Sequence, residues 1–382
     1  MWDIQLFKLN FDHLEVEAVS RVVGGGWLSM GDEIKQFENS FGAFLGGSAY
    51  CKAVSNGTAA LHMALLALDV GRGDEVIIPS LTFVADVNVV NLTGATAVLC
   101  DSNSMDDWNM SVNSIEKQIT ERTKAVIVVH YAGYPCADIL AISQLCRDRG
   151  VGLIEDVAHA PGASVDGKKC GTFGDVGCFS FFSNKNLSIG EGGMVSTKSH
   201  ELDKKLGYLR SHGMTTLTLD RHKGRAITYD VAQPGLNYRM DEMRAAIGSV
   251  QLDKLPAGNV RRGVLTHRYR CNFHGSSVLV PFANQASNLR SVYHILPVLL
   301  PEGADRIAVI EALKKNRIQS SIHYPPFWNF TAYKGHFSPS DAPITAKISS
   351  RQLTLPLFPT MTDDEVDQVT VALLEALNEL RR

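Results

Sequence analysis

Apolar and polar positions between residues 50 and 200 follow two alternating periods. Short β-rich runs, typical of buried strands, are separated by stretches with the spacing of amphipathic helices. The clearest helical stretches are 58–68 and 139–149, and the second ends before Gly150. The runs predicted as strands are 51–56, 74–80, 95–101, 124–131 and 151–158. This order predicts an α/β fold with a mainly parallel central sheet covered by helices on both faces.

Two further features of this region depart from the alternation. The apolar runs 176–182 and 192–197 flank a short polar segment, which predicts a strand hairpin rather than another strand–helix–strand unit. The segment 210–235 is polar and has no periodicity, so we expect a long loop that is functional or mobile.

The pattern changes after about residue 255, where a basic stretch and a β-rich run precede two amphipathic helical segments. We therefore expect a large domain at 1–255, including an N-terminal arm, and a small α+β domain at 256–382. The segments on which this division rests are 259–270, 291–300, 305–316 and 363–380.

Composition and charge restrict the classes of function. The chain has 382 residues and a formal net charge of -3, so no global positive field exists to hold nucleic acid or an anionic membrane. The basic segment DRHKG (220–224) is therefore interpreted as a solvated loop. No apolar run is long enough for a membrane span, and the N-terminal segment carries acidic residues where a signal peptide would be apolar. Seven scattered cysteines without a C-x-x-C pair predict reduced thiols and a cytoplasmic protein.

One lysine, Lys185, stands between the apolar run 176–182 and the glycine-rich segment GEGG. Desolvation of an ammonium group costs free energy, so a lysine between buried neighbours is either paired or reacts as a neutral amine. A reactive amine suggests Schiff-base chemistry, for which pyridoxal phosphate (PLP) is the commonest partner. PLP also requires a carboxylate at its ring nitrogen, a cradle for its phosphate and a group against its ring.

A carboxylate for the ring nitrogen is offered by the strand that ends in LIEDVAHA. Asp156 can project into the ligand crevice at the carboxyl end of the sheet, while Glu155 points to the opposite face. Ala158 is small enough for a ring to lie against it, and His159 could bind the ring's phenolic oxygen. Taken alone, the motif could equally be a solvated strand end with an acidic helix cap.

The phosphate cradle is predicted where a strand passes into a helix at SNGTAAL. Gly57 allows close approach, the helix N-terminus has free N–H groups and the Thr58 hydroxyl can donate. The same stretch could also be only an ordinary helix cap by Ser55 or Asn56. Ser180 offers a second hydroxyl and Phe83 a ring to stack, although each could also be an ordinary core residue. His212 and His222 lack nearby Cys or carboxylate partners at metal-ligand spacing, so no metal site is predicted.

The motif FSFFSNKNLSIGEGGMV resembles the Schiff-base lysine motif of the DegT/DnrJ-type sugar aminotransferases, which are PLP enzymes of fold type I. The resemblance runs from about residue 20 to the C-terminus. Other matching segments follow in order: GWLSMGDEIKQFENSF, SNGTAALHMAL, PSLTFVADVN, EDVAHAPGA, GTFGDVGCFSF, GLNYRMDEMRAAIGSVQL, IHYPP and LPLFP.

The resemblance implies a large PLP-binding domain and a role for each matching residue. Lys185 would form the Schiff base and Asp156 would pair with the pyridinium nitrogen. Asn237 would reach the phosphate of the neighbouring subunit, which implies a homodimer with shared active sites. The remaining matches are Thr58 and Ser180 at the phosphate, and Phe83 and His159 beside the ring.

The predicted activity is transfer of an amino group from glutamate or glutamine to a keto sugar, which we expect to be nucleotide-linked. Lysine at position 185, where some relatives carry histidine and act as dehydratases, favours transamination. Two alternatives stay open: an aminotransferase acting on a cyclitol ketone or another carbonyl compound, and a PLP-binding sensor without turnover.

Overall fold

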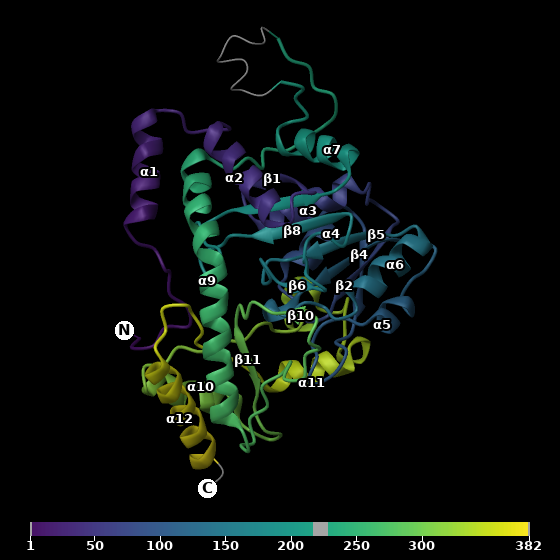
Figure 1. The fold of residues 1–382 in the computed structure, drawn as a ribbon. Helices are drawn as coiled ribbons and strands as arrows, with labels where there is room; N and C mark the ends of the chain where they lie inside the picture. Colours follow the sequence, from purple (N-terminus) through teal and green to yellow (C-terminus); the bar gives the residue numbers. More distant parts are fainter. Residues whose placement is uncertain (1, 217–227, 381–382) are drawn as a thin grey trace.

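A seven-stranded sheet forms the centre of the computed structural model, which describes residues 2–216 and 228–380 (Figure 1). The segment 220–224 and His222 lie outside the described residues. The strand order is β1-β9-β8-β5-β4-β2-β3. The strands are β1 (Tyr50–Val54), β2 (Glu75–Pro79), β3 (Thr96–Cys100), β4 (Thr123–Val129), β5 (Gly152–Asp156), β8 (Val176–Ser180) and β9 (Gly193–Thr197).

Strand direction places the carboxyl ends of most of these strands at one edge of the sheet. β9 pairs antiparallel with both β1 and β8, whereas the adjacent strands β3, β2, β4, β5 and β8 pair in parallel with one another. The predicted strand hairpin is thus formed by β8 and β9. Ligands of open α/β sheets bind beside the carboxyl ends of the strands, so this edge is where a site is expected.

Helices cover both faces of the sheet, as the near-continuous apolar strands predicted. Alternate residues of β4 belong to opposite hydrophobic clusters, with Ile127 on one face and Val128 on the other. The helices on the Ile127 face are α3 (Gly57–Ala67), α4 (Ala85–Leu92) and α7 (His200–Arg210). Those on the Val128 face are α2 (Asp32–Phe44), α6 (Ile139–Arg149) and the first half of α9 (Glu242–Phe273). The mainly parallel α/β architecture is confirmed.

Helix α9 runs without interruption across residue 255, and Figure 1 shows it extending along the molecule. Its first half packs on α1 (His13–Gly25) and α2, and its second half packs on α12 (Asp363–Glu379). Leu265 and Tyr269 of the second half belong to a separate hydrophobic cluster, formed with β11 (Leu296–Leu299), β12 (Gln352–Leu355), α10 (Arg306–Lys315) and α12. The C-terminal part is therefore α+β, while the division at residue 255 stays a prediction.

The remaining elements are short. A three-stranded sheet contains β6 (Ser164–Val165), β7 (Lys168–Lys169) and β10 (Leu289–Arg290). The other helices are α5 (Val112–Glu116), α11 (Pro343–Arg351) and the 3₁₀ turns η1 (Tyr131–Gly133), η2 (Phe327–Asn329), η3 (Thr331–Tyr333) and η4 (Pro339–Asp341). Within the described ranges, no helix combines the length and apolar character needed to cross a membrane.

Candidate active site

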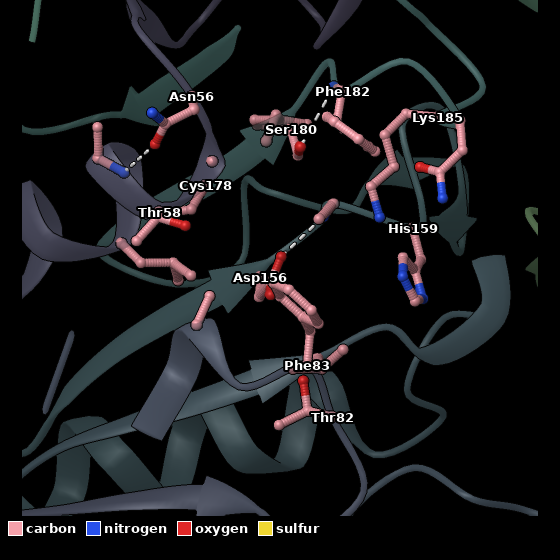
Figure 2. Close-up of a pocket in the computed structure, with 18 of the residues that line it drawn as sticks. Asn56, Thr58, Thr82, Phe83, Asp156, His159, Cys178, Ser180, Phe182 and Lys185 are labelled. Carbon is pink, nitrogen blue, oxygen red and sulfur yellow. Dashed lines mark hydrogen bonds between the residues drawn. The ribbon is translucent and has the colours of Figure 1, made fainter. Parts of the chain in front are cut away.

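A cavity of 710 Å³ opens at the carboxyl edge of the central sheet (Figure 2). Its walls come from segments that follow β1, β2, β5 and β8, together with residues from the C-terminal part of the chain. The predicted site residues that line it are Gly57, Thr58, Phe83, Asp156, His159, Ser180 and Lys185. Asn237 is the one predicted residue that does not line this cavity.

Lys185 lies in the turn between β8 and β9, where its backbone N–H donates to the carbonyl of Phe182 at 2.8 Å. The residue is half-buried and borders the cavity, and Figure 2 shows its amine pointing towards the space above Asp156. Burial lowers the pKa of the Lys185 amine to about 8, although the Asp156 carboxylate opposes the shift. More of this amine is therefore uncharged near neutral pH than in an ordinary lysine, which favours nucleophilic chemistry.

Asp156 ends β5 beneath Lys185, and its Oδ1 accepts a hydrogen bond from the N–H of Ala158 at 2.8 Å. A second carboxyl group, Asp86, is fully buried in the first turn of α4. Burial raises the pKa of both carboxyls, and the Asp156 charge raises that of Asp86 further. Asp86 receives one hydrogen bond, from Thr82 Oγ1 at 2.6 Å, and its Oδ1 has no partner among the described residues. Asp86 is therefore the more readily protonated of the two carboxyls, and Asp156, which accepts a backbone hydrogen bond, is the one better suited to carry the charge.

Glu155 points to the opposite face of β5, as strand alternation predicted. Its carboxylate is bonded to His130 Nε2 at 3.0 Å and accepts the N–H groups of Gly171, Phe173 and Gly174. Burial alone would raise the pKa of Glu155, but these partners lower it. The thiol of Cys170 lies close to the same two side chains. Because Glu155 and His130 already have partners, this cluster is explained as structural support for β5.

The N-terminus of α3 and the end of β8 meet at the other end of the cavity. Asn56 caps α3 by accepting the N–H of Ala59 at 2.8 Å, so the ordinary cap considered from the sequence is present. Gly57 and Thr58 then contribute helix N-terminal N–H groups beside the cavity. A Cβ atom on Gly57 would lie 2.8 Å from the Cβ of Ser180, so only glycine permits this approach. The arrangement fits a bound anion.

Phe83 and His159 lie on the walls of the cavity between these two ends. Phe83 is half-exposed, and its ring centroid lies 5.4 Å from that of Tyr324. His159 is buried, its Nδ1 accepts the N–H of Ala132 at 3.2 Å and its Nε2 lies 2.9 Å from the hydroxyl of Tyr324. Burial lowers the pKa of His159 well below its ordinary value, and the nearby Lys185 charge lowers it further, so the ring is neutral.

Asn237 is exposed, and its backbone forms an isolated antiparallel bridge with Ser211. The two residues lie near the two ends of the predicted loop 210–235. Its neighbour Tyr238 does line the cavity, and the Tyr238 hydroxyl lies 3.0 Å from His62 Nδ1. The backbone of this segment is fixed, because the N–H of Ser55 donates to the carbonyl of Tyr238. Within its own chain, Asn237 is thus held near the cavity without lining it.

These groups fit PLP. The cavity provides an amine of lowered pKa, a carboxylate below it and a helix N-terminus whose glycine leaves room for a phosphate. Sequence reasoning missed Thr82, Asp86, Tyr238 and Tyr324. Tyr324 lies in the quoted segment IHYPP, but no periodicity indicates that a residue from the C-terminal part reaches this cavity.

Comparison with known proteins agrees with the geometry. The sequence profile of the DegT/DnrJ/EryC1/StrS aminotransferase family matches residues 10–374. The chain is 35% identical over 375 residues to the uncharacterized protein MJ1066 of Methanocaldococcus jannaschii, and the match covers 96% of each chain.

Solved structures of aminotransferases share the whole fold. The aminotransferase TlmJ from Streptoalloteichus hindustanus superimposes with a TM-score of 0.90 at 32% identity, covering 100% of both chains. Spr1654 from Streptococcus pneumoniae, provisionally described as a sugar aminotransferase, was solved in PLP and PMP forms. Its PMP form has a TM-score of 0.90 at 29% identity and covers 97% of this chain and 98% of its own.

Proposed function

Because the chain belongs to the DegT/DnrJ/EryC1/StrS aminotransferase family and is a PLP-dependent aminotransferase, we propose that it transfers an amino group from glutamate or glutamine to a nucleotide-linked keto sugar. The observation that carries this proposal is the convergence of Lys185, Asp156 and the N-terminus of α3 on one cavity. A cavity of 710 Å³ is within the usual range of ligand sites.

Each group has a distinct part in this chemistry. When bound, PLP supplies a carbonyl that receives the amino group and a ring that accepts electrons. Lys185 would hold the cofactor through its neutral amine, with release of water, and after displacement by the amino donor it would carry the proton between the substrate carbon and the cofactor carbon. Asp156 holds a proton on the ring nitrogen. Gly57, Thr58 and Ser180 bind the phosphate and so fix the orientation of the ring.

Two features support a sugar as the amino acceptor. Spr1654, which shares the fold over almost its whole length, is provisionally described as a sugar aminotransferase. The cavity also has polar groups that can bind hydroxyls. The side-chain oxygen of Asn184 is buried without a partner among the described residues, and Glu191 lies on the same cavity wall. A polyhydroxylated substrate could satisfy both groups.

The reaction is tested by separating its two halves. We expect glutamate or glutamine alone to convert the visible band of the bound cofactor to that of pyridoxamine phosphate, and a keto sugar to reverse the change. Because both halves use one site, initial rates should follow ping-pong kinetics. Intersecting double-reciprocal lines, with both substrates needed before any product, would contradict the proposal. Turnover of a cyclitol ketone but not of nucleotide-linked 3-keto or 4-keto hexoses would change the substrate assignment.

We further propose a homodimer in which Asn237 completes the active site of the partner subunit. Asn237 is exposed and outside its own cavity, although the adjacent Tyr238 lines it. Lys185 is the only Lys or Arg among the described residues that line the cavity, so a phosphate dianion needs additional donors. Apolar side chains are exposed on the neighbouring helices α1 and α9, which supports association through these helices; they are Leu14, Val16, Val23, Val260 and Val264.

Mixing two inactive variants tests the shared site. Lys185→Ala and Asn237→Asp homodimers are each expected to be inactive, the second because it places a negative charge beside the phosphate. A heterodimer would combine the intact Lys185 of one chain with the intact Asn237 of the other in one of its two sites. Activity should then return to about half the wild-type value per heterodimer, from the geometry of a two-fold interface.

A matched mixture controls for subunit exchange and residual activity. Lys185→Ala and Asp156→Asn damage the same half of the site, so their heterodimer has no intact site and should stay inactive. Exchange itself is measured with differently tagged subunits. If heterodimers of Lys185→Ala and Asn237→Asp form and show no activity, Asn237 does not act across the interface.

The thiols support a cytoplasmic location, which we also propose. Free thiols persist in reducing compartments, whereas secreted proteins usually form disulfides. The buried cysteines are Cys51, Cys100, Cys136, Cys146, Cys170 and Cys178, all of them free, and the exposed Cys271 is free as well.

A further inference from the structure

Tyr324 brings a phenol into the cavity from the C-terminal part of the chain. It lines the cavity together with Lys185 and Asp156. Its backbone is fixed on both sides, because the hydroxyl of Tyr131 donates to the carbonyl of His323 and Gln352 Nε2 donates to the carbonyl of Tyr324 at 2.8 Å. The hydroxyl of Tyr324 therefore has a defined place in the cavity wall.

The hydrogen bonds of His159 set the direction in which this hydroxyl can donate. His159 Nδ1 accepts the N–H of Ala132, so it carries no proton, and in the neutral ring the proton is on Nε2. Nε2 then donates to the Tyr324 hydroxyl, 2.9 Å away. Both nitrogens of His159 are thus engaged within the protein, whereas the proton of the Tyr324 hydroxyl has no acceptor among the described residues.

The phenol of Tyr324 also keeps its proton at any working pH. Burial raises its pKa far above the ordinary value, and the charge of Asp156 raises it further. The ring of Phe83 packs at 5.4 Å from the Tyr324 ring and limits its rotation. The result is a neutral donor on the wall of the cavity, 2.9 Å from the nitrogen of His159 that was predicted to reach the phenolic oxygen of the ring.

We propose that Tyr324, rather than His159, donates the hydrogen bond to the phenolic oxygen of bound PLP, and that His159 is a positioning residue that orients the Tyr324 hydroxyl. The inference rests on the proposed cofactor site. It assigns the contact predicted for His159 to a residue from the other part of the chain, so the small C-terminal part contributes directly to the chemistry of the cavity.

The first test is the pH titration of the visible band of the bound cofactor. A donor to the phenolic oxygen favours its anionic form, so Tyr324→Phe should raise the apparent pKa of this band by about one unit and lower turnover about tenfold. Tyr333→Phe is the matched control, because the hydroxyl of Tyr333 is bonded to Asn88 outside this cavity. The control should titrate like the wild type.

A double variant distinguishes positioning from direct contact. If His159 acts through Tyr324, the titration of Tyr324→Phe/His159→Ala should match that of Tyr324→Phe alone. His159→Gln, which can still donate through its amide, should lie closer to the wild type than His159→Ala. An unchanged titration in Tyr324→Phe together with a shifted one in His159→Ala would overturn the proposal and return the contact to His159.

A measurement without cofactor keeps this inference separate from the proposed function. Nitrogen NMR of the apoprotein should show His159 protonated on Nε2, and Tyr324→Phe should move the Nε2 signal while leaving Nδ1 in place. A His159 protonated on Nδ1, or an Nε2 signal insensitive to Tyr324→Phe, would overturn the hydrogen-bond arrangement. Absence of any visible band in the wild-type protein would instead refute the cofactor site.

Discussion

Lys185→Ala is expected to abolish the covalent cofactor adduct and to lower turnover by more than about 10⁴-fold, as loss of a nucleophile does in other enzymes. Lys185 is the cavity's one lysine among the described lining residues, so no neighbour can replace its amine. Borohydride reduction of the holoenzyme, followed by peptide mapping, should find the adduct on Lys185. Lys169→Ala is the control, because Lys169 also has a lowered pKa but lies outside this cavity. An adduct on another lysine would refute the assignment.

The pH dependence of cofactor capture follows from the same side chain. Only the neutral amine attacks a carbonyl, and burial lowers the pKa of Lys185 to about 8. The rate at which the apoprotein captures PLP should therefore rise with pH and level off above a midpoint near 8. An ordinary lysine would give a midpoint near about 10.4. Stopped-flow absorbance measures this rate, and a rise that continues to pH 10 would show that the amine is not desolvated in solution.

The sheet and half of the site could be predicted because both follow local rules. Alternation along β5 separates Asp156 from Glu155, and the structure places them on opposite faces as expected. Gly57 and Ser180 were predicted as parts of one phosphate cradle, and the close approach of their Cβ positions shows why residue 57 is glycine. Each of these features can be predicted from one strand, the residues at its end and the helix that follows.

Features that depend on long-range packing could not be predicted in this way. Tyr324 reaches the cavity because Tyr131 and Gln352, which are far from it in sequence, fix its backbone. Nothing in the sequence singled out Asp86, and only the structure shows that burial and the nearby Asp156 raise the pKa of its carboxyl. Helix α9 continues across residue 255, and its two halves pack into two different hydrophobic clusters. The sequence showed only a change of composition at this point.

The second large effect is expected from Asp156→Asn. The substitution keeps the shape of the side chain, and the N–H of Ala158 can still donate to its oxygen, so the fold and the cavity should persist. What is lost is the negative charge beneath the cofactor ring. A carboxylate near a cation raises the cation's pKa by about one to three units, so the ring nitrogen should lose its proton and its capacity to accept electrons.

Turnover of Asp156→Asn should consequently fall by about 100-fold or more, while the adduct on Lys185 still forms. Loss of the carboxylate also removes the charge that raises the pKa of Lys185, so the midpoint for cofactor capture should move below 8. Asp107→Asn is a matched control, since burial also raises the pKa of Asp107 but its carboxylate lies outside the cavity. A wild-type rate in Asp156→Asn would exclude Asp156 from the mechanism. Loss of the adduct with the fold intact would instead show that Asp156 serves binding rather than proton retention at the ring.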